Sequence, residues 1–480
     1  MKRFRGIPSY VLGAKADIDI ECLYTREGEA MTKVITYGTY DLFHQGHYNL
    51  LKHAKELGDY LIVGVTTEHF DEARGKINVV DDVLTRVQHV RETGFADQII
   101  IEDHEGQKIE DIQRYGVDIF TVGSDWVGSF DYLNQYCRVV YLPRTPDISS
   151  TNIRQERFRS IRIGLIGTGR MAPRFVSEAK YVSGAEVTAA YNPQRNELNI
   201  FQSKNRDVEC FYTEFEKFLE EVDAVYIASP NETHFDYAKM SLEAGKHVLS
   251  EKPLAFTKAE TETLYELASE KNLVLLEGVK AAYSPGFQEL INVALSGKIG
   301  EIRDIEANFT RLASPESRER RDAEYGGAFL EFGPSVMLPI IKLLGGNYIS
   351  LNFHSQWDEN GVDLYNKVDF VYPNAFATAK SGVNVKTEGQ LIISGTKGYI
   401  IAQSPWWLMK HFEVRYEDEN KVESYDPTFR GDGLRYEISE FVRKINGIGK
   451  NGYKLTRGES IAMSEITERY MAYKAATAKR

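Results

Sequence analysis

The stretch VITYGTYDLFHQGHYNLL, residues 34–51, decides the fold of the first part of this chain. An apolar, strand-like run ends in Gly38, and a helical pattern begins at the HQGH tetrapeptide of residues 44–47. A strand that leads through a glycine-bearing turn into a helix directs free backbone N–H groups and the positive end of the helix dipole at one point. The stretch therefore predicts the first strand, an anion-binding turn and the first helix of an α/β domain.

Two histidines, His44 and His47, lie three residues apart at that turn, where both can face the same point. An imidazole there can donate hydrogen bonds to phosphoryl oxygens as charge builds on them in a transition state. Gly46 between them lets the backbone approach a ligand closely. The tetrapeptide by itself leaves a second interpretation open, in which the two histidines only cap the helix.

The rhythm of the chain predicts three domains. Strand-like runs alternate with helical patterns from residue 33 to about residue 153 and again from residue 161 to about residue 280, which is typical of parallel sheets with crossover helices. After residue 300 alternating runs follow one another with turns between them, which favours an open, mainly antiparallel sheet. We predict an N-terminal extension and three domains, at residues 1–32, 33–156, 157–283 and 284–480.

Three segments of the first domain carry a family resemblance. They are VITYGTYDLFHQGHYNLLKHAKELGDYLIVGV (34–65), DIFTVGSDWVGSFDYL (118–133) and VVYLPRTPDISSTNIR (139–154). Together they resemble the cytidylyltransferases, most closely the glycerol-3-phosphate cytidylyltransferases, which implies an HxGH nucleotidylyltransferase domain of Rossmann-like fold. The resemblance implies CTP as substrate, with Mg²⁺ neutralising the departing pyrophosphate.

The same resemblance assigns roles to residues of this domain. It implies that Thr39, His44 and His47 bind and activate the triphosphate and that Asp41 orders the turn. The implied catalytic residues are His44, His47, Lys76 and Arg144. The implied nucleotide-binding residues are Gly38, Thr39, Asp41, Arg86, Asp125, Thr145, Ser149, Ser150 and Thr151.

A second glycine-rich turn opens the next domain. GLIGTGRMA, residues 164–172, follows a strand-like run and precedes a helical pattern, and it has the G-x-G-x-x-A form of a dinucleotide-binding fingerprint. Downstream, AVYIASPNETHFDYAKMSLEAGKHVLSEKPLA (224–255) resembles the glucose-fructose oxidoreductase and inositol dehydrogenase family, Gfo/Idh/MocA. The resemblance implies a Rossmann domain followed by an α+β open-sheet domain that binds substrate and self-associates.

This second resemblance implies that Lys252, in the EKP signature, supplies a proton to the substrate oxygen as hydride moves, and that burial beside Glu251 tunes it. The implied cofactor-binding residues are Gly167, Gly169, Arg170, Met171, Asn192, Arg195, Ser229, Pro230, Asn231, His234 and Glu251. NAD-selective folds usually carry an acidic residue where this sequence reads AAYNPQRN (189–196). Arg170 and Arg195 could instead receive a 2′-phosphate, so NADP(H) is favoured over NAD(H).

The later family signature departs from its usual pattern. In YGGAFLEFGPSVMLP (325–339) Glu331 and Gly333 keep the pattern, but Ser335 stands where the family has a catalytic His or Tyr. A serine is no acid or base near neutral pH without help. Lys252 acts alone, or another group such as Tyr283 substitutes, or this half binds a dinucleotide without turnover. Tyr283, Glu331 and Ser335 are the candidate substrate residues.

The leading hypothesis is a bifunctional enzyme that reduces a keto- or aldose phosphate to a polyol phosphate and converts it into a CDP-polyol such as CDP-glycerol or CDP-ribitol. The reverse order of steps stays open. One alternative is an active cytidylyltransferase fused to a non-catalytic dinucleotide-binding module that regulates or oligomerises it, and another is an adenylyltransferase–reductase fusion. A class I aminoacyl-tRNA synthetase is disfavoured, because its lysine-bearing motif is matched only by KMSLE (239–243), within a predicted helix.

Composition limits the partners. A formal net charge of −12 argues against nucleic acid and anionic lipid as partners. The three cysteines, Cys22, Cys137 and Cys210, form no metal-ligand pair, and no uncharged run is long enough to span a membrane. We expect a cytoplasmic homodimer or homotetramer with no membrane insertion, and we assign no role to residues 1–30.

Overall fold

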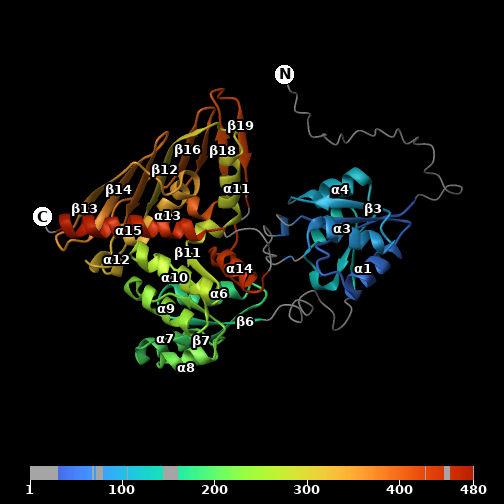
Figure 1. The fold of residues 1–480 in the computed structure, drawn as a ribbon. Helices are drawn as coiled ribbons and strands as arrows, with labels where there is room; N and C mark the ends of the chain where they lie inside the picture. The colour runs from blue at the N-terminus through green and yellow to red at the C-terminus, as the bar shows by residue number, and fades with distance from the viewer. Residues whose placement is uncertain are drawn as a thin grey trace, which may run out of the picture.

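The computed structural model of the 480-residue chain describes residues 31–67, 70, 71, 79, 81–104, 106–143, 160–427, 429–447 and 454–478. These residues form two parallel sheets and one mixed sheet (Figure 1). Residues 1–30 of the predicted extension lie outside the described residues. Within the described residues no helix is both long and apolar enough to cross a membrane.

The first sheet has five parallel strands in the order β3-β2-β1-β4-β5. Its order reverses between β1 and β4, and ligands of such sheets bind outside the carboxyl ends of the strands at this point. The predicted strands and helices are confirmed. The elements are β1 Lys33–Gly38, α1 Gln45–Lys55, β2 Tyr60–Thr66, α3 Val83–Glu92, β3 Gln98–Glu102, α4 Gln107–Tyr115, β4 Ile119–Gly123, η2 Ser124–Trp126, η3 Asp131–Gln135 and β5 Arg138–Leu142.

The second sheet has six parallel strands in the order β11-β10-β9-β6-β7-β8, and it reverses between β6 and β9. Lys239, of the synthetase-like pentapeptide, lies inside α9, as expected. The elements are β6 Ile161–Ile166, α6 Met171–Ala179, β7 Ala185–Tyr191, α7 Arg195–Lys204, β8 Cys210–Tyr212, α8 Phe215–Glu220, β9 Ala224–Ile227, η4 Asn231–Thr233, α9 His234–Glu243, β10 His247–Glu251, α10 Lys258–Glu270, β11 Leu275–Gly278 and η5 Lys280–Tyr283.

The third sheet has eight strands in the order β13-β14-β15-β12-β16-β17-β18-β19. Its neighbours pair antiparallel except β12 and β15, which run parallel, so the prediction of a mainly antiparallel sheet is confirmed. The elements are α11 Pro285–Leu295, β12 Ile302–Thr310, α12 Arg318–Arg321, α13 Ala328–Leu344, β13 Ser350–Trp357, β14 Asp363–Val371, β15 Phe376–Gly382, β16 Leu391–Gly395, β17 Tyr399–Ala402, η6 Trp406–Leu408, β18 Phe412–Arg415, β19 Val422–Tyr425, α14 Leu434–Ile445 and α15 Arg457–Thr477.

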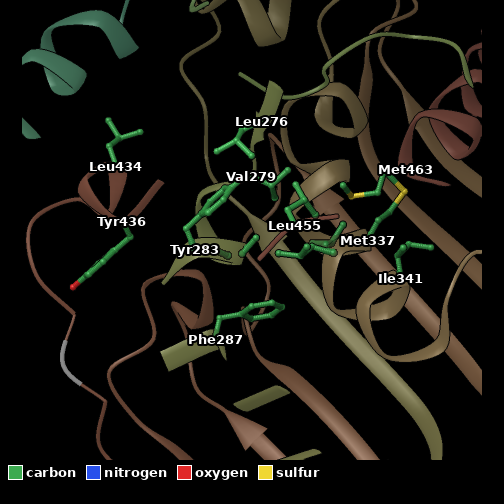
Figure 2. Packing of buried hydrophobic residues seen from close by; sticks show 14 of the residues in the cluster. Leu276, Val279, Tyr283, Phe287, Met337, Ile341, Leu434, Tyr436, Leu455 and Met463 are labelled. Atoms are coloured by element: carbon green, nitrogen blue, oxygen red, sulfur yellow. The ribbon is translucent and has the colours of Figure 1, made fainter. Parts of the chain in front are cut away.

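The second and third sheets share one apolar core. Helix α13 packs on β12 and β15 of the mixed sheet, and α15 packs between α13 and α10. Figure 2 shows part of this core, where Leu276 of β11 and Val279 lie near Met337 and Ile341 of α13 and Met463 of α15. The shared core holds the domains of the second and third sheets together, so a site can be built from residues of both.

Candidate active sites

The turn after β1 presents the two predicted histidines together. His44 is the N-cap residue of α1, and its Nδ1 accepts a hydrogen bond from the Gly46 N–H at 3.0 Å. The neutral ring therefore carries its proton on Nε2. The rings of His44 and His47 stack with their centroids 3.9 Å apart. His44 therefore does cap the helix, through Nδ1. This cap is compatible with phosphate binding by His44 Nε2 and by His47.

The shape of this turn is fixed by a reciprocal contact with the segment before α3. Asp41, which is buried, accepts a hydrogen bond from the Asp81 N–H at 2.9 Å, and the Leu42 N–H donates to the Asp81 carboxylate at 3.0 Å. Tyr40 and Leu42 have φ values of 54° and 49°, a strained conformation for non-glycine residues. A side chain at Gly38 would approach the Tyr40 ring to 2.8 Å. Asp41 therefore lies where it can order the turn, as the resemblance implies.

Arg86 lies behind the turn and not at its open face. Its side chain has no exposed surface, and its Nη1 donates to the carbonyls of Thr39 and Thr66 at 2.9 and 2.8 Å and to Asp71 at 3.2 Å. The Thr39 hydroxyl also donates to Asp71, at 2.9 Å. The Arg86 guanidinium and the Thr39 hydroxyl are therefore engaged inside the protein, where they hold the turn, and their nucleotide-binding roles stay predictions.

Several predicted residues of this site cannot be placed. Lys76, Arg144, Thr145, Ser149, Ser150 and Thr151 lie outside the described residues, and the side chain of Asp125 is not described either. A polar cluster that the sequence did not single out lies near the carboxyl ends of β1 and β3. There Lys108 pairs with Glu102, and the Tyr37 hydroxyl donates to Asp111 at 2.9 Å. No local pattern signals this cluster, because its members come from two strands and a helix.

In the second half, a cavity of about 1010 Å³ lies at the carboxyl ends of β6 and β9, where the strand order reverses. Gly167 has φ +92°, and a Cβ there would approach the carbonyl of Ala228 to 2.8 Å, so only glycine fits the turn. The helix α6 that follows has no side-chain cap, which leaves its N-terminal N–H groups available to an anion. The turn and the cavity fit a dinucleotide whose pyrophosphate lies at this helix.

Neither of the two arginines predicted to bind a 2′-phosphate is free to do so inside the cavity. The Asn192 side chain lines the cavity and donates to the Thr168 hydroxyl at 2.7 Å. Arg195, at the start of α7, is exposed, donates to Thr213 at 3.2 Å and does not line the cavity. Arg170 lines the cavity, but its guanidinium pairs with Glu319 and Glu331 at 2.9 and 2.8 Å. The Arg170 guanidinium is therefore already engaged by two carboxylates.

The SPN segment lines the same cavity. Ser229 and Pro230 form its wall together with Asn231, whose side-chain amide approaches the Tyr325 carbonyl at 3.4 Å. His234 is buried, with its ring nitrogens 2.8 and 3.0 Å from the carbonyls of Pro253 and Ser229, and burial lowers its pKa. His234 therefore ties the SPN turn to the segment after Lys252.

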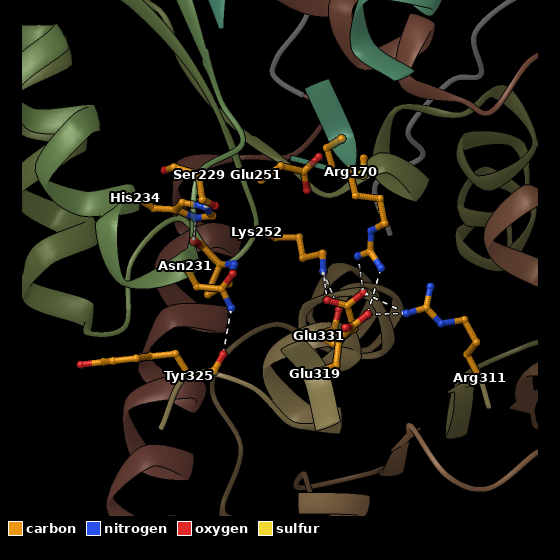
Figure 3. A network of polar contacts seen from close by, with 12 residues as sticks. Arg170, Ser229, Asn231, His234, Glu251, Lys252, Arg311, Glu319, Tyr325 and Glu331 are labelled. Carbon is orange, nitrogen blue, oxygen red and sulfur yellow. Dashed lines mark hydrogen bonds and ion pairs between the residues drawn. The ribbon is translucent and has the colours of Figure 1, made fainter. Parts of the chain in front are cut away.

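Lys252 projects into the cavity, and its partner is Glu331 (Figure 3). The ammonium donates to the Glu331 carbonyl at 2.5 Å and lies 4.0 Å from the Glu331 carboxylate. The expected neighbour Glu251 instead accepts a hydrogen bond from the buried Tyr226 hydroxyl at 2.5 Å. Lys252 therefore contacts Glu331, a residue 79 positions further along the chain, while the adjacent Glu251 binds Tyr226.

The two other candidate substrate residues are not brought to the cavity. Tyr283 is fully buried, its hydroxyl donates to the Glu277 carbonyl at 2.6 Å, and burial raises its pKa well above the ordinary value. It cannot substitute for a catalytic tyrosine there. Ser335, one turn after Glu331 in α13, is half-buried and is not among the residues that line the cavity. Met171 lines the cavity as expected. Within the described residues no three His, Cys, Asp or Glu side chains form a metal site.

Comparison with known families separates the two halves. Residues 35–156 match the cytidylyltransferase-like family model. Residues 161–279 match the Gfo/Idh/MocA oxidoreductase family with its NAD-binding Rossmann fold, and residues 287–401 match the C-terminal domain of that family.

Individual relatives agree with this division. The chain is 47% identical over 127 residues to glycerol-3-phosphate cytidylyltransferase of Bacillus spizizenii, covering 26% of this chain and 97% of the relative. It is 27% identical over 318 residues to the scyllo-inositol 2-dehydrogenase (NADP(+)) IolU of Bacillus subtilis, covering 64% and 95%. The fold of the second half is similar to KijD10, a 3-ketoreductase from Actinomadura kijaniata solved with NADP and TDP-benzene. The TM-score is 0.57 and the identity 22%, over 65% of this chain and 96% of KijD10.

Proposed function

Because residues 35–156 belong to the cytidylyltransferase-like family and residues 161–279 and 287–401 to the Gfo/Idh/MocA oxidoreductase family, we propose that this chain is a bifunctional enzyme that makes a CDP-polyol. The second half reduces a keto- or aldose phosphate to a polyol phosphate. The first half transfers a cytidylyl group from CTP to that phosphate and releases pyrophosphate. CDP-glycerol and a CDP-ribitol-like alditol are the candidate products, and such activated polyols would supply teichoic-acid or capsule-like polymers.

In the transferase half, an oxygen of the polyol phosphate attacks the α-phosphorus of CTP in line, and the bond to the departing pyrophosphate breaks. His44 and His47 stack side by side at the start of α1 and would donate hydrogen bonds to phosphoryl oxygens as their charge grows. Mg²⁺ bound with CTP would neutralise the pyrophosphate. The protein contributes mainly a rigid turn, which Asp41 and Asp81 hold in place.

In the reductase half, the hydride would come from a dinucleotide held in the cavity. Lys252 donates a proton to the carbonyl oxygen that becomes the new hydroxyl group, so that hydride and proton together account for the two hydrogens added. Glu331 holds the ammonium in the cavity through its backbone carbonyl and its carboxylate. The placement of Lys252 in the dinucleotide cavity is the observation that carries the proposal of a working reductase rather than a silent module.

NADP(H) is the proposed cofactor. Neither an aspartate nor a glutamate follows β7 at the position where NAD-selective folds bind the ribose hydroxyls, since Asn192 stands there. Asn192 is already hydrogen-bonded to Thr168 and to the Gln194 N–H. Of the two predicted arginines, Arg195 on α7 is not paired with a carboxylate of the described residues, so it is the proposed partner of a 2′-phosphate although it does not line the cavity. The names of IolU and of the KijD10 structure both include NADP, which supports the same preference.

The proposal is tested by measuring pyrophosphate release from CTP, with ATP as the alternative nucleotide. A panel of three- to six-carbon polyol phosphates is compared with the corresponding keto- or aldose phosphates plus NADPH or NADH. We expect a precursor to support release only when reduced cofactor is present. Release with ATP but not CTP would instead identify an adenylyltransferase.

Two variants assign the steps to their sites. Lys252→Met should slow cofactor oxidation by about 10²–10⁴-fold, the usual contribution of a general acid, and leave transfer to a ready-made polyol phosphate unchanged. His44→Ala should abolish pyrophosphate release and leave cofactor oxidation unchanged. Lys258→Met, at an exposed lysine paired with Glu465, is the control. Unchanged cofactor oxidation by the Lys252 variant would refute the reductase assignment and favour the silent module.

The second candidate reverses the order, so that the reductase acts on a CDP-linked carbonyl compound. The likeness to KijD10, whose structure contains TDP-benzene with NADP, favours it. Supplying the purified CDP ester of the keto sugar separates the two orders. Cofactor oxidation with this ester, but not with the free keto phosphate, would establish the reverse order.

A further inference from the structure

Five charged side chains gather at the end of the cavity that contains Lys252. Glu319 and Glu331 lie at the centre, and Lys252, Arg170 and Arg311 approach them from three sides (Figure 3). All five line the cavity. Three positive charges face two negative charges, so the cluster retains one unit of positive charge next to the proposed proton donor.

The two carboxylates lie beneath the arginines. The side chains of Glu319 and Glu331 are 13% and 18% exposed, whereas those of Arg170 and Arg311 are 52% and 44% exposed. The guanidinium groups therefore form the accessible layer, and a ligand in the cavity meets cations first. The carboxylates hold both arginines in fixed positions, which reduces the conformational entropy that ligand binding would cost.

The Arg311 guanidinium has N–H donors that no described residue accepts. Its Nη2 donates to Glu319 at 2.5 Å and lies 3.8 Å from Glu331, and its guanidinium lies 5.7 Å from the centre of the Phe332 ring. Among the described residues its Nε and Nη1 have no hydrogen-bond partner. The three remaining N–H groups, one on Nε and two on Nη1, can each donate a hydrogen bond to a phosphate oxygen, and the guanidinium keeps its positive charge. The hydroxyl residues Ser314 and Ser317, on the same segment, also line the cavity.

We propose that Arg311, with Arg170 beside it, binds the phosphate group of the substrate that the reductase half reduces. The proposal rests on the proposed function and narrows its substrate class to phosphate esters, either a free sugar phosphate or a sugar linked to CDP. Arg311 comes from the end of β12 and Arg170 from the glycine-rich turn before α6, so the subsite joins the two domains of this half. Arg170 and Lys252 both pair with Glu331, which brings this subsite next to the proposed proton donor.

The test compares Arg311→Met with Arg303→Met in the full-length protein. Arg303 lies in β12, the strand that Arg311 directly follows, pairs with Glu301 and does not line the cavity, so it is the matched control. Reductase KM values are measured for a keto phosphate, for the same sugar without phosphate and for its CDP ester. Arg311→Met should raise KM for the phosphate esters about tenfold or more, as expected for a lost hydrogen bond between charged groups. KM for NADPH and for the unphosphorylated sugar should not change, and Arg311→Lys should restore part of the loss.

The esters also distinguish the source of the phosphate. A larger effect on the free sugar phosphate than on the CDP ester identifies the terminal phosphate as the ligand, and the opposite result identifies the diphosphate. Equal changes in KM for the phosphorylated and unphosphorylated sugars, or equal effects of the two methionine variants, would overturn the assignment of Arg311.

A binding measurement keeps the proposal testable if no sugar is turned over. Inorganic phosphate is titrated into the NADPH-loaded protein while the nicotinamide fluorescence, which reports only on this half, is followed. A saturable change should occur in the unaltered protein and in Arg303→Met and be lost in Arg311→Met. The absence of a response in the unaltered protein would overturn the phosphate subsite. Phosphate binding without any turnover would leave the subsite standing and count against the proposed reduction.

Discussion

At the scale of single residues, burial decides what a charged side chain can do. Arg86 has no exposed surface, and its guanidinium binds backbone carbonyls and Asp71 behind the histidine turn. Removing one partner of such a buried pair costs about 3–5 kcal/mol, because the other charge stays buried without compensation. Arg86 thus holds the histidine turn from inside the protein.

Glu277, in β11, is a second buried charge, and its protonation is linked to stability. It is 2% exposed, one of its oxygens accepts a hydrogen bond from the Leu254 N–H at 3.1 Å, and burial raises its pKa from 4.5 to about 7. The folded protein therefore binds this proton more tightly than the unfolded chain does. As the pH rises from 4.5 to about 7, this group lowers the free energy of unfolding, and the loss persists at higher pH.

Glu277→Gln removes this titration and keeps an oxygen that can accept from Leu254. We expect the variant to raise Tm relative to the unaltered protein at about pH 8, and to raise it much less, or not at all, at about pH 5. Thermal unfolding followed by circular dichroism at both pH values measures the difference. Glu270→Gln, at an exposed position of α10, is the control and should shift neither value. A Tm gain for Glu277→Gln that does not depend on pH would contradict the linkage.

At the scale of elements, the strand–turn–helix units place both sites. The turn after β6 needs Gly167, because of its positive φ and its close approach to the chain at Ala228. The next glycine of the fingerprint, Gly169, has no protein atom within 4 Å of a Cβ built on it. The fold therefore requires glycine at position 167, whereas the protein without a ligand would tolerate a side chain at position 169.

Alanine at each glycine separates these two roles. Gly167→Ala should lower Tm and weaken NADPH binding, since strain and a backbone collision cost about 1–3 kcal/mol. Gly169→Ala should leave Tm within about 1 °C of the unaltered protein, as for a surface substitution, and weaken NADPH binding only. Calorimetry gives Tm and fluorescence titration gives the dissociation constant. An equal loss of Tm in both variants would be inconsistent with the geometry of the turn.

At the scale of the whole molecule, the chain contains separate apolar cores. Two clusters of buried apolar residues cover the two faces of the first sheet, and all their buried residues lie within residues 34–142. The buried residues of the clusters in the second half lie within residues 161–470. The second and third sheets share a single cluster. The described part of the molecule is therefore divided into two units of stability and not three.

Calorimetry should resolve two unfolding transitions, because chains with independent cores depart from two-state behaviour. A ligand that binds one folded unit raises the Tm of that unit only. CTP with Mg²⁺ should raise one transition and NADP⁺ the other, and at ligand concentrations 100-fold above the dissociation constant each stabilisation is about 2.7 kcal/mol. A single transition that both ligands raise would show that the two units unfold together.

Local patterns determined much of this protein. The period of apolar residues predicted strands such as β2 and β3 and the helix α1, because neighbouring side chains of a strand or helix share a face whatever the rest of the chain does. The glycine-rich turn and the HQGH tetrapeptide indicated the two candidate sites, because each motif is a short local segment that can be read without knowing the rest of the fold. The strands β8, β13, β18 and β19 went unpredicted, because most of their side chains are half-buried or exposed and they contain no long apolar run.

Only the tertiary structure decided which side chains meet. It paired Lys252 with Glu331, Arg170 with Glu319 and Arg86 with Asp71, across sequence separations that no local period can encode. It also buried Tyr283 and so removed it from the substrate site. Burial and long-range charge pairing depend on how sheets and helices pack around a shared core. The sequence by itself therefore determined where the sites begin, and packing determined which residues complete them.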